Sequence, residues 1–284
     1  MRAVALEGAT IVLTGASSGI GRATARLLAP LAGHLILHGL EPAKDVDDLL
    51  AEIRSARRPG SEVDYLRADF GSLADVARLA QDIRAATPRI DVLVNNAARP
   101  GPTRRTVTGD GNEATLQTNY LAPVLLTESL LDIIGGDVRG RIVNVASATH
   151  LSARLFLDDL DLARHGYSDA TAYAHSKLAL VTWSCWLAAH RPRPSLDVVS
   201  MHPGIIATTL LHAMFSIGGD RPEHAARNVL AVAGQHGDNG AYYDERERAE
   251  PNAEALDPAM QDRLRDLTMT RLAAWLPGKR VAGR

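Results

Sequence analysis

The chain has 284 residues, 46% of them hydrophobic and 23% charged, so it can bury a substantial core and is too apolar to be disordered throughout. Its 31 basic and 33 acidic residues leave a net charge of −2, which gives no basic footprint for nucleic acid. The single cysteine, Cys185, excludes an intrachain disulfide and any multi-cysteine metal site, and it suits a reducing compartment.

The first residues contain one short apolar run, 9–13, which is too short for a secretory signal and is not followed by a cleavage site. No stretch approaches the roughly 18 apolar residues that a membrane-spanning helix needs. We therefore expect a cytoplasmic protein without a membrane span.

Short apolar runs alternate along the chain with longer segments of helical period. The predicted strands are 10–13, 35–37, 63–66, 92–94, 141–145 and 197–200. The predicted helices are 20–31, 46–57, 73–86, 113–134, 172–190 and, in the tail, 258–275. Continuous Val/Ile/Leu runs between helices indicate a doubly wound parallel sheet of the Rossmann type, and no linker divides residues 1–284. The sequence therefore predicts one α/β domain.

Two long connections, 149–170 and 204–222, interrupt this alternation. Long connections in compact domains are often functional loops, so we expect 204–222 to cover a substrate site. The apolar residues that predict an apolar pocket wall there are Leu210, Leu211, Met214, Phe215 and Ile217.

A glycine-rich turn, TGASSGIG at 14–21, follows the first strand and opens the first helix. Glycines permit a tight turn and a close backbone approach, and a helix N-terminus offers unpaired N–H groups to phosphate. The residues expected to cradle a pyrophosphate are Gly15, Ser17, Ser18, Gly19, Ile20 and Gly21. The same stretch matches G-x-S-x-G, which would make Ser17 a hydrolase nucleophile. That alternative is disfavoured because the nucleophile turn should follow a central strand, not the first one.

Three motifs occur in a fixed order: TGASSGIG, NNAA at 95–98 and YxxxK at 173–177. From about residue 8 to residue 250 the chain thereby resembles the short-chain dehydrogenase/reductase family. The fragments FLDDL and YAHSKLAL are similar to the retinol dehydrogenase and WW-domain oxidoreductase branch. The resemblance implies an NAD(P)-dependent oxidoreductase (a ketoreductase type) that interconverts an alcohol and a ketone or aldehyde.

The resemblance also implies catalytic roles. Tyr173 would be the general acid/base, and Lys177, one helical turn later, would lower its pKa and hold the nicotinamide ribose. Ser147 would bind the substrate oxygen, and Asn119 would organise a water that links Lys177 to solvent. A cofactor-binding sensor or scaffold without turnover is the main alternative, and it would not need this set of residues.

Further positions are implied along the cofactor. Those beyond the glycine turn are Asp69 and Phe70 toward the adenine, Ala97 at the adenosine, Pro203, Gly204, Ile205 and Ile206 at the nicotinamide, and Thr208 at phosphate or amide. Asn95 would organise the backbone near the cofactor. An acidic residue after the second strand usually binds the ribose 2′-OH, and a basic one receives a 2′-phosphate. Here Leu40 stands where relatives that bind NADP often have arginine, and Arg22, helped by His38 or Lys44, is left to reach a 2′-phosphate. Glu41 could instead bind the ribose, but we favour NADP(H) over NAD(H).

The ten histidines show no metal-ligand spacing, so no metal site is expected. The family resemblance implies a homodimer or homotetramer in which 113–134 and 172–190 pack against a second subunit. The expected partner is a small carbonyl or alcohol substrate of apolar character.

Overall fold

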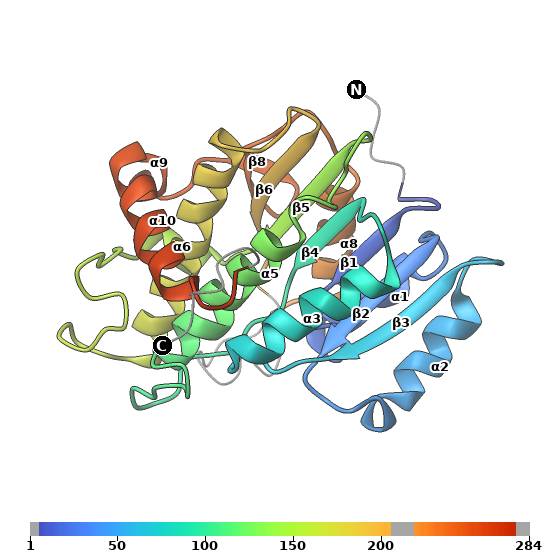
Figure 1. Cartoon of the computed structure of the whole chain (residues 1–284), viewed down its shortest axis with the longest axis horizontal. Helices are drawn as coiled ribbons and strands as arrows, with labels where there is room; N and C mark the ends of the chain where they lie inside the picture. The colour runs from blue at the N-terminus through green and yellow to red at the C-terminus, as the bar shows by residue number, and fades with distance from the viewer. Residues whose placement is uncertain (1–5, 206–218, 277–284) are drawn as a thin grey trace.

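The computed structural model describes residues 6–205 and 219–276, and in these ranges the strands form one 8-stranded sheet (Figure 1). The strands are β1 (Thr10–Leu13), β2 (His34–Gly39), β3 (Glu62–Arg67), β4 (Val92–Asn95), β5 (Gly140–Val145), β6 (Leu196–His202), β7 (Tyr242–Asp244) and β8 (Glu247–Ala249). Their order is β3-β2-β1-β4-β5-β6-β7-β8. All neighbours pair in parallel except β8, which is antiparallel to β7. The predicted doubly wound parallel sheet is confirmed.

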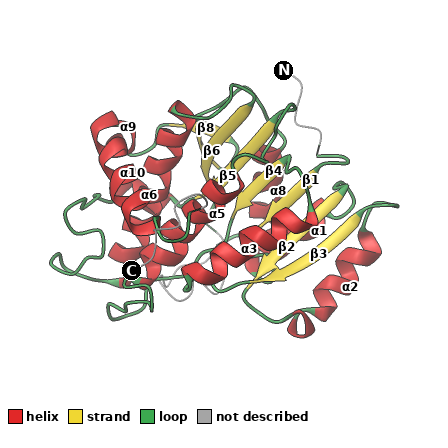
Figure 2. Ribbon diagram, viewed as in Figure 1, coloured by secondary structure: helices red, strands yellow, loops and turns green. Residues whose placement is uncertain are grey.

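Helices cover both faces of the sheet (Figure 2). One face carries α1 (Gly19–Leu28), α2 (Asp47–Ala56) and α8 (Pro222–Ala233). The other carries α3 (Leu73–Ala86), α5 (Ala122–Leu130), α6 (Asp169–Ala189) and, outside these, α9 (Ala253–Leu256) and α10 (Pro258–Leu272). Every residue of β5 and β6 is buried between the two layers, so their apolar residues do not alternate strictly with polar ones.

The structure differs from the predicted elements in three places. The helix predicted over 113–134 begins as α4 (Ala114–Leu116), passes through a π-helical turn, η2 (Gln117–Leu121), and continues as α5. The elements α8, β7 and β8 were not predicted, and short 3-10 turns occur at η1 (Ala43–Asp45) and η3 (Ala148–Ser152). Residues 206–218 lie outside the described part of the chain, and with them the predictions for Ile206, Thr208 and the apolar pocket wall.

The sheet order changes direction between β1 and β4, because the chain leaves β1 toward β2 and later returns to the other side of β1. In doubly wound sheets the loops diverge at this point and leave a crevice at the carboxyl ends of the strands. The glycine turn after β1 and the NNAA segment after β4 both lie there. No helix in the two described ranges is long and apolar enough to cross a membrane.

Candidate active site

A cavity of about 820 Å³ lies at the carboxyl ends of the central strands. It is lined by residues from the β1–α1 turn, the ends of β2 to β6 and the start of α6. The predicted site residues that line it are Gly15, Ser17, Ser18, Gly19, Ile20, Gly21, Leu40, Asp69, Phe70, Ala97, Ser147, Tyr173, Lys177, Pro203 and Gly204. Segments up to about 190 residues apart in sequence thus share one cavity.

The turn after β1 accepts only glycine at two of its positions. Gly15 has a positive φ of 67°, and a Cβ atom on it would lie 2.7 Å from the Cα of Ala97. A Cβ atom on Gly21 would lie 1.9 Å from the carbonyl oxygen of Gly15, so α1 starts directly against the turn. The first N–H groups of a helix have no partner within it, and here they lie beside the cavity.

Side chains from β1 and β4 hold this turn in place. The Thr14 hydroxyl oxygen accepts hydrogen bonds from the backbone N–H groups of Asn96 and Ala97, both at 3.0 Å. The Asn96 amide donates to the carbonyl oxygens of Thr14 at 2.9 Å and Gly15 at 3.2 Å. Sequence reasoning missed both Thr14 and Asn96, although a threonine that ends a buried strand and a paired asparagine were visible signals.

Asn95, predicted to organise the backbone near the cofactor, does not line the cavity. Its amide donates to the Thr127 hydroxyl at 3.0 Å and to the Asn144 side-chain oxygen at 2.8 Å. These partners lie in the core between β4, β5 and α5. Of the two asparagines, it is Asn96 that reaches the glycine turn.

Tyr173 and Lys177 both lie on α6, whose N-terminus is capped by the Ser168 hydroxyl. The Lys177 Nζ lies 5.7 Å from the centroid of the Tyr173 ring and donates a hydrogen bond of 2.8 Å to the Val145 carbonyl oxygen. Both side chains are almost fully buried. The one-turn spacing therefore brings them together on the face that meets the cavity.

Burial displaces the two pKa values in opposite directions. It raises the pKa of Tyr173 to about 12, against a smaller lowering by a hydrogen bond with Ser147, and it lowers the pKa of Lys177 to about 7. Low polarity disfavours both phenolate and ammonium. Burial therefore dominates both pKa values here, and the expectation that a charged Lys177 lowers the pKa of Tyr173 stays a prediction.

Asn119 lies in the π-helical turn and is completely buried. Its side-chain oxygen accepts from the Arg99 N–H at 2.8 Å, while its amide donates to the Arg99 carbonyl at 3.0 Å and the Ser176 hydroxyl at 3.1 Å. Ser176 in turn donates to the Tyr173 carbonyl oxygen at 2.7 Å. Asn119 thus joins the loop after β4 to α6 without lining the cavity, and its expected role toward a water stays a prediction.

Arg22 does not line the cavity either, because its guanidinium pairs with Asp48 of α2 at 2.6 Å. At the same end, Glu41 does line the cavity. Two side chains of β3 hold the chain there: the Tyr65 hydroxyl donates to the Glu41 carbonyl at 2.7 Å and Arg67 to the Leu40 carbonyl at 3.0 Å.

Other lining residues were not predicted from the sequence. They are Ala68, Asn96, Ala98, Arg99, Pro100, Thr118, Val145, Ala146, Ala148, Thr149 and His202. Ile205, which was expected to face the nicotinamide, also lines the cavity. Most of these residues lie at or just after the ends of strands. The predicted topology brings these strand ends to the same edge of the sheet, but it does not show which side chains point into the cavity.

Comparison with known proteins agrees with this geometry. The sequence profile of the short chain dehydrogenase family matches residues 9–216. The chain belongs to that family. It is 31% identical to retinol dehydrogenase 13 of Homo sapiens over 279 residues, which cover 91% of this chain and 83% of that one. It is 33% identical to polyprenol dehydrogenase of Mus musculus over a gapped alignment of 299 residues, which covers 97% of this chain and 84% of that one.

A solved structure supports the same assignment. A protein from Mycobacterium paratuberculosis superposes with a TM-score of 0.76 at 28% identity and with 95% of each chain covered. The retinol dehydrogenases among the relatives place this short-chain dehydrogenase in the retinol dehydrogenase branch of the family.

Proposed function

We propose that this short-chain dehydrogenase interconverts an alcohol and a ketone or aldehyde with a nicotinamide dinucleotide. The observation that carries the proposal is that Ser147, Tyr173 and Lys177 line the same cavity as the glycine turn. A proton donor and a hydride donor must meet at one carbonyl, and this cavity provides a place for both.

The cavity fits such a cofactor by its own geometry. The glycine positions that leave no room for a Cβ atom form a cradle for pyrophosphate at the start of α1. Asp69, Phe70 and Ala97 would hold the adenosine half, and Pro203 and Gly204 the nicotinamide. When bound, the nicotinamide ring supplies the hydride for reduction or accepts it in oxidation.

The chain's own residues would handle the proton. With a pKa of about 12, the Tyr173 hydroxyl is protonated near neutral pH and can donate to the carbonyl oxygen of a ketone. Ser147 would donate a hydrogen bond to that same oxygen. Lys177, within 5.7 Å of the tyrosine ring, would stabilise the phenolate whenever its amine is charged.

Tyr173→Phe tests the proposal with Tyr167→Phe as its matched control, since Tyr167 lies before α6 and does not line the cavity. Ketone reduction is followed by NADPH absorbance, and cofactor affinity by protein fluorescence. We expect Tyr173→Phe to lose about 10²–10⁴-fold in turnover while NADPH binding and the control stay unchanged. Equal rates in parent and variant would remove Tyr173 as the proton donor. Binding without turnover in every protein would favour the sensor or scaffold.

For the cofactor we propose NADP(H), with Arg22 as the residue that receives the 2′-phosphate. Among the described residues, Arg22 forms its ion pair with Asp48, whose side chain is 70% exposed, and exposed ion pairs contribute little. Glu41 favours the opposite choice, because a carboxylate that lines this end of the cavity binds ribose hydroxyls and repels phosphate.

Asp48→Asn distinguishes the hypothesis that Arg22 binds a 2′-phosphate from the hypothesis that Glu41 sets the cofactor preference. Releasing Arg22 should strengthen NADPH binding by about two- to fivefold without changing the affinity for NADH. Glu52→Gln is the control, because Glu52 forms the equivalent 2.8 Å pair with Arg26 farther along α1. If Asp48→Asn has no effect and Glu41→Gln alone improves NADPH binding, Glu41 sets the preference instead.

A further inference from the structure

We propose that His38 is a positioning residue of this cavity: its uncharged imidazole holds the glycine turn and Phe70 in the arrangement that receives the adenosine half of the cofactor. The inference rests on the proposed function but concerns a residue outside the catalytic set. His38 lies near the end of β2, is 3% exposed and lines the cavity.

Both ring nitrogens of His38 are used. Nδ1 accepts a hydrogen bond from the backbone N–H of Gly15 at 3.3 Å, and Nε2 contacts the Ala68 carbonyl oxygen at 3.1 Å. A carbonyl can only accept, so Nε2 carries the proton and Nδ1 is free to accept. One imidazole therefore joins the turn after β1 to the end of β3.

The backbone of His38 holds the next residue of the same turn. Its carbonyl oxygen accepts from the N–H of Ala16 at 2.8 Å. Two successive N–H groups of the turn are thus bonded to His38, which leaves the following N–H groups of α1 for a phosphate.

The ring of His38 also sets the position of an aromatic wall. It stacks on Phe70 with centroids 4.5 Å apart and planes 12° from parallel. Phe70 and Asp69 line the cavity where the adenine is expected. Loss of the imidazole would release the glycine turn and this wall together.

The arrangement requires a neutral ring. A protonated Nδ1 would direct its N–H at the N–H of Gly15 and lose that bond. Burial lowers the pKa of His38 to about 4, although the Ala68 carbonyl and the carboxylates of Glu41 and Asp69 act in the opposite direction. The ring is therefore uncharged across the neutral range.

His38→Phe tests the proposal, since it keeps an aromatic ring against Phe70 and removes both hydrogen bonds. His34→Gln is the matched control, because His34 lies on the same strand and pairs with Asp64 instead of reaching the cavity. We expect His38→Phe to bind NADPH, and ADP as a probe of the adenosine half, at least roughly tenfold more weakly. The KM for NADPH should rise with it, while kcat at saturating cofactor stays within about twofold.

Unchanged ADP and NADPH affinity in a folded His38→Phe would overturn the inference, and so would an equal loss in His34→Gln. If the parent protein binds neither NADPH, NADH nor ADP, the proposed function itself fails, which a loss confined to the variant cannot mimic. A second measurement needs no variant: nitrogen-15 NMR of the parent should show the His38 ring as the neutral Nε2–H tautomer from pH 8 to 5. A charged ring or the Nδ1–H tautomer would contradict the proposal.

Discussion

The pKa values of two neighbouring side chains in the cavity depend more on their burial than on each other. Tyr173 and Lys177 are close in space, yet the pKa of Tyr173 lies above its ordinary value and that of Lys177 below it. The tyrosine is therefore protonated near neutral pH, and the lysine loses its proton at a lower pH than an exposed lysine does. Catalytic groups with pKa values near the working pH are typical of active sites.

The low pKa of Lys177 predicts a pH dependence. If its ammonium supports proton donation by Tyr173, kcat/KM for ketone reduction is highest below pH 7 and falls as the amine loses its proton above a pKa of about 7. Tyr173 stays protonated over this range, so its own titration causes no change in kcat/KM below pH 10. Rates measured from pH 6 to 9 check this, and Lys177→Arg, which cannot deprotonate, should abolish the fall. A parent profile that is flat through pH 7 would remove the ammonium from the reaction.

Helices and strands were predicted well where the pattern is local. Strands β1 to β6 and helices α1, α2, α3, α6 and α10 all appear within a few residues of their predicted ranges. Strands β7 and β8 have only three residues each, too few for a recognisable period, and they exist because they pair with β6 and with each other. Short elements of this kind depend on partners that the local sequence does not reveal.

The π-helical turn η2 is a second feature that periodicity could not predict. It inserts a wider turn in a helix that reads as regular, and such turns are frequent at functional sites. Asn119 lies inside it and contacts Arg99 and Ser176. Which way that side chain turns depends on the wider turn, so the motif predicted the residue but not its contacts.

The tail helix α10 packs against α6, one of the two helices on which a second subunit was expected (Figure 1). The Tyr120 hydroxyl of η2 shares a buried hydrogen bond of 2.6 Å with Thr268 of α10. The Trp186 indole of α6 donates to Asp262 at 3.0 Å, and Leu264 and Leu272 are fully buried. Part of the apolar surface of α6 is therefore covered within the chain.

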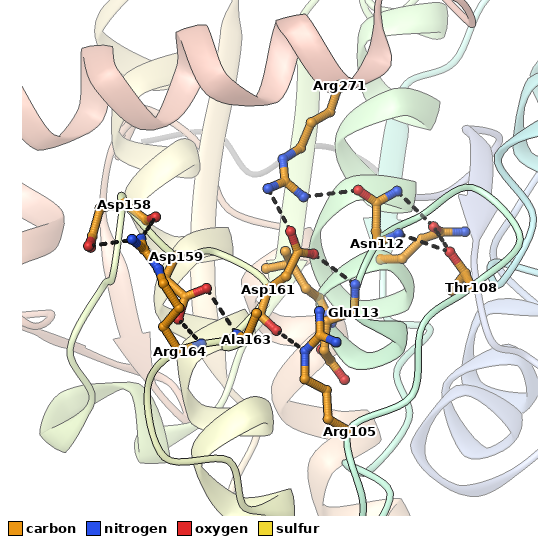
Figure 3. A network of polar contacts seen from close by, with 12 residues as sticks. Arg105, Thr108, Asn112, Glu113, Asp158, Asp159, Asp161, Ala163, Arg164 and Arg271 are labelled. Atoms are coloured by element: carbon orange, nitrogen blue, oxygen red, sulfur yellow. Dashed lines mark hydrogen bonds and ion pairs between the residues drawn. The ribbon is translucent and has the colours of Figure 1, made fainter.

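Arg271 anchors the same helix at its other end (Figure 3). Its guanidinium donates to the Asp161 carboxylate at 2.7 Å and to the Asn112 side-chain oxygen at 3.0 Å. Asp161 also accepts from the backbone N–H of Glu113 at 2.8 Å and, through its carbonyl, from Arg105 at 2.7 Å. The tail helix is therefore connected to the loop that precedes α4 and to the loop that precedes α6.

This cover leads us to predict a monomer, against the homodimer or homotetramer that the family resemblance implied. Size-exclusion chromatography with light scattering should give a mass near 30.4 kDa at micromolar concentration. Leu264→Asp, which places a charge under α10, should lower the melting temperature and cause self-association as the apolar face opens. A stable dimer of the unaltered chain would show that another surface joins the subunits.

Local pattern and motif order were enough to predict the parallel sheet, the glycine turn and the proximity of Tyr173 and Lys177. The alternation of element types, the turn and the one-turn spacing are each set by residues a few positions apart. Tertiary structure alone decided that Asn96 and not Asn95 holds the turn, that Arg22 pairs with Asp48, and that His38 spans two strand ends. It also decided that the tail covers α6. These outcomes depend on contacts between distant residues, such as Tyr120 and Thr268, 148 positions apart, and on burial, which sets the charge of a side chain only once the chain has folded around it.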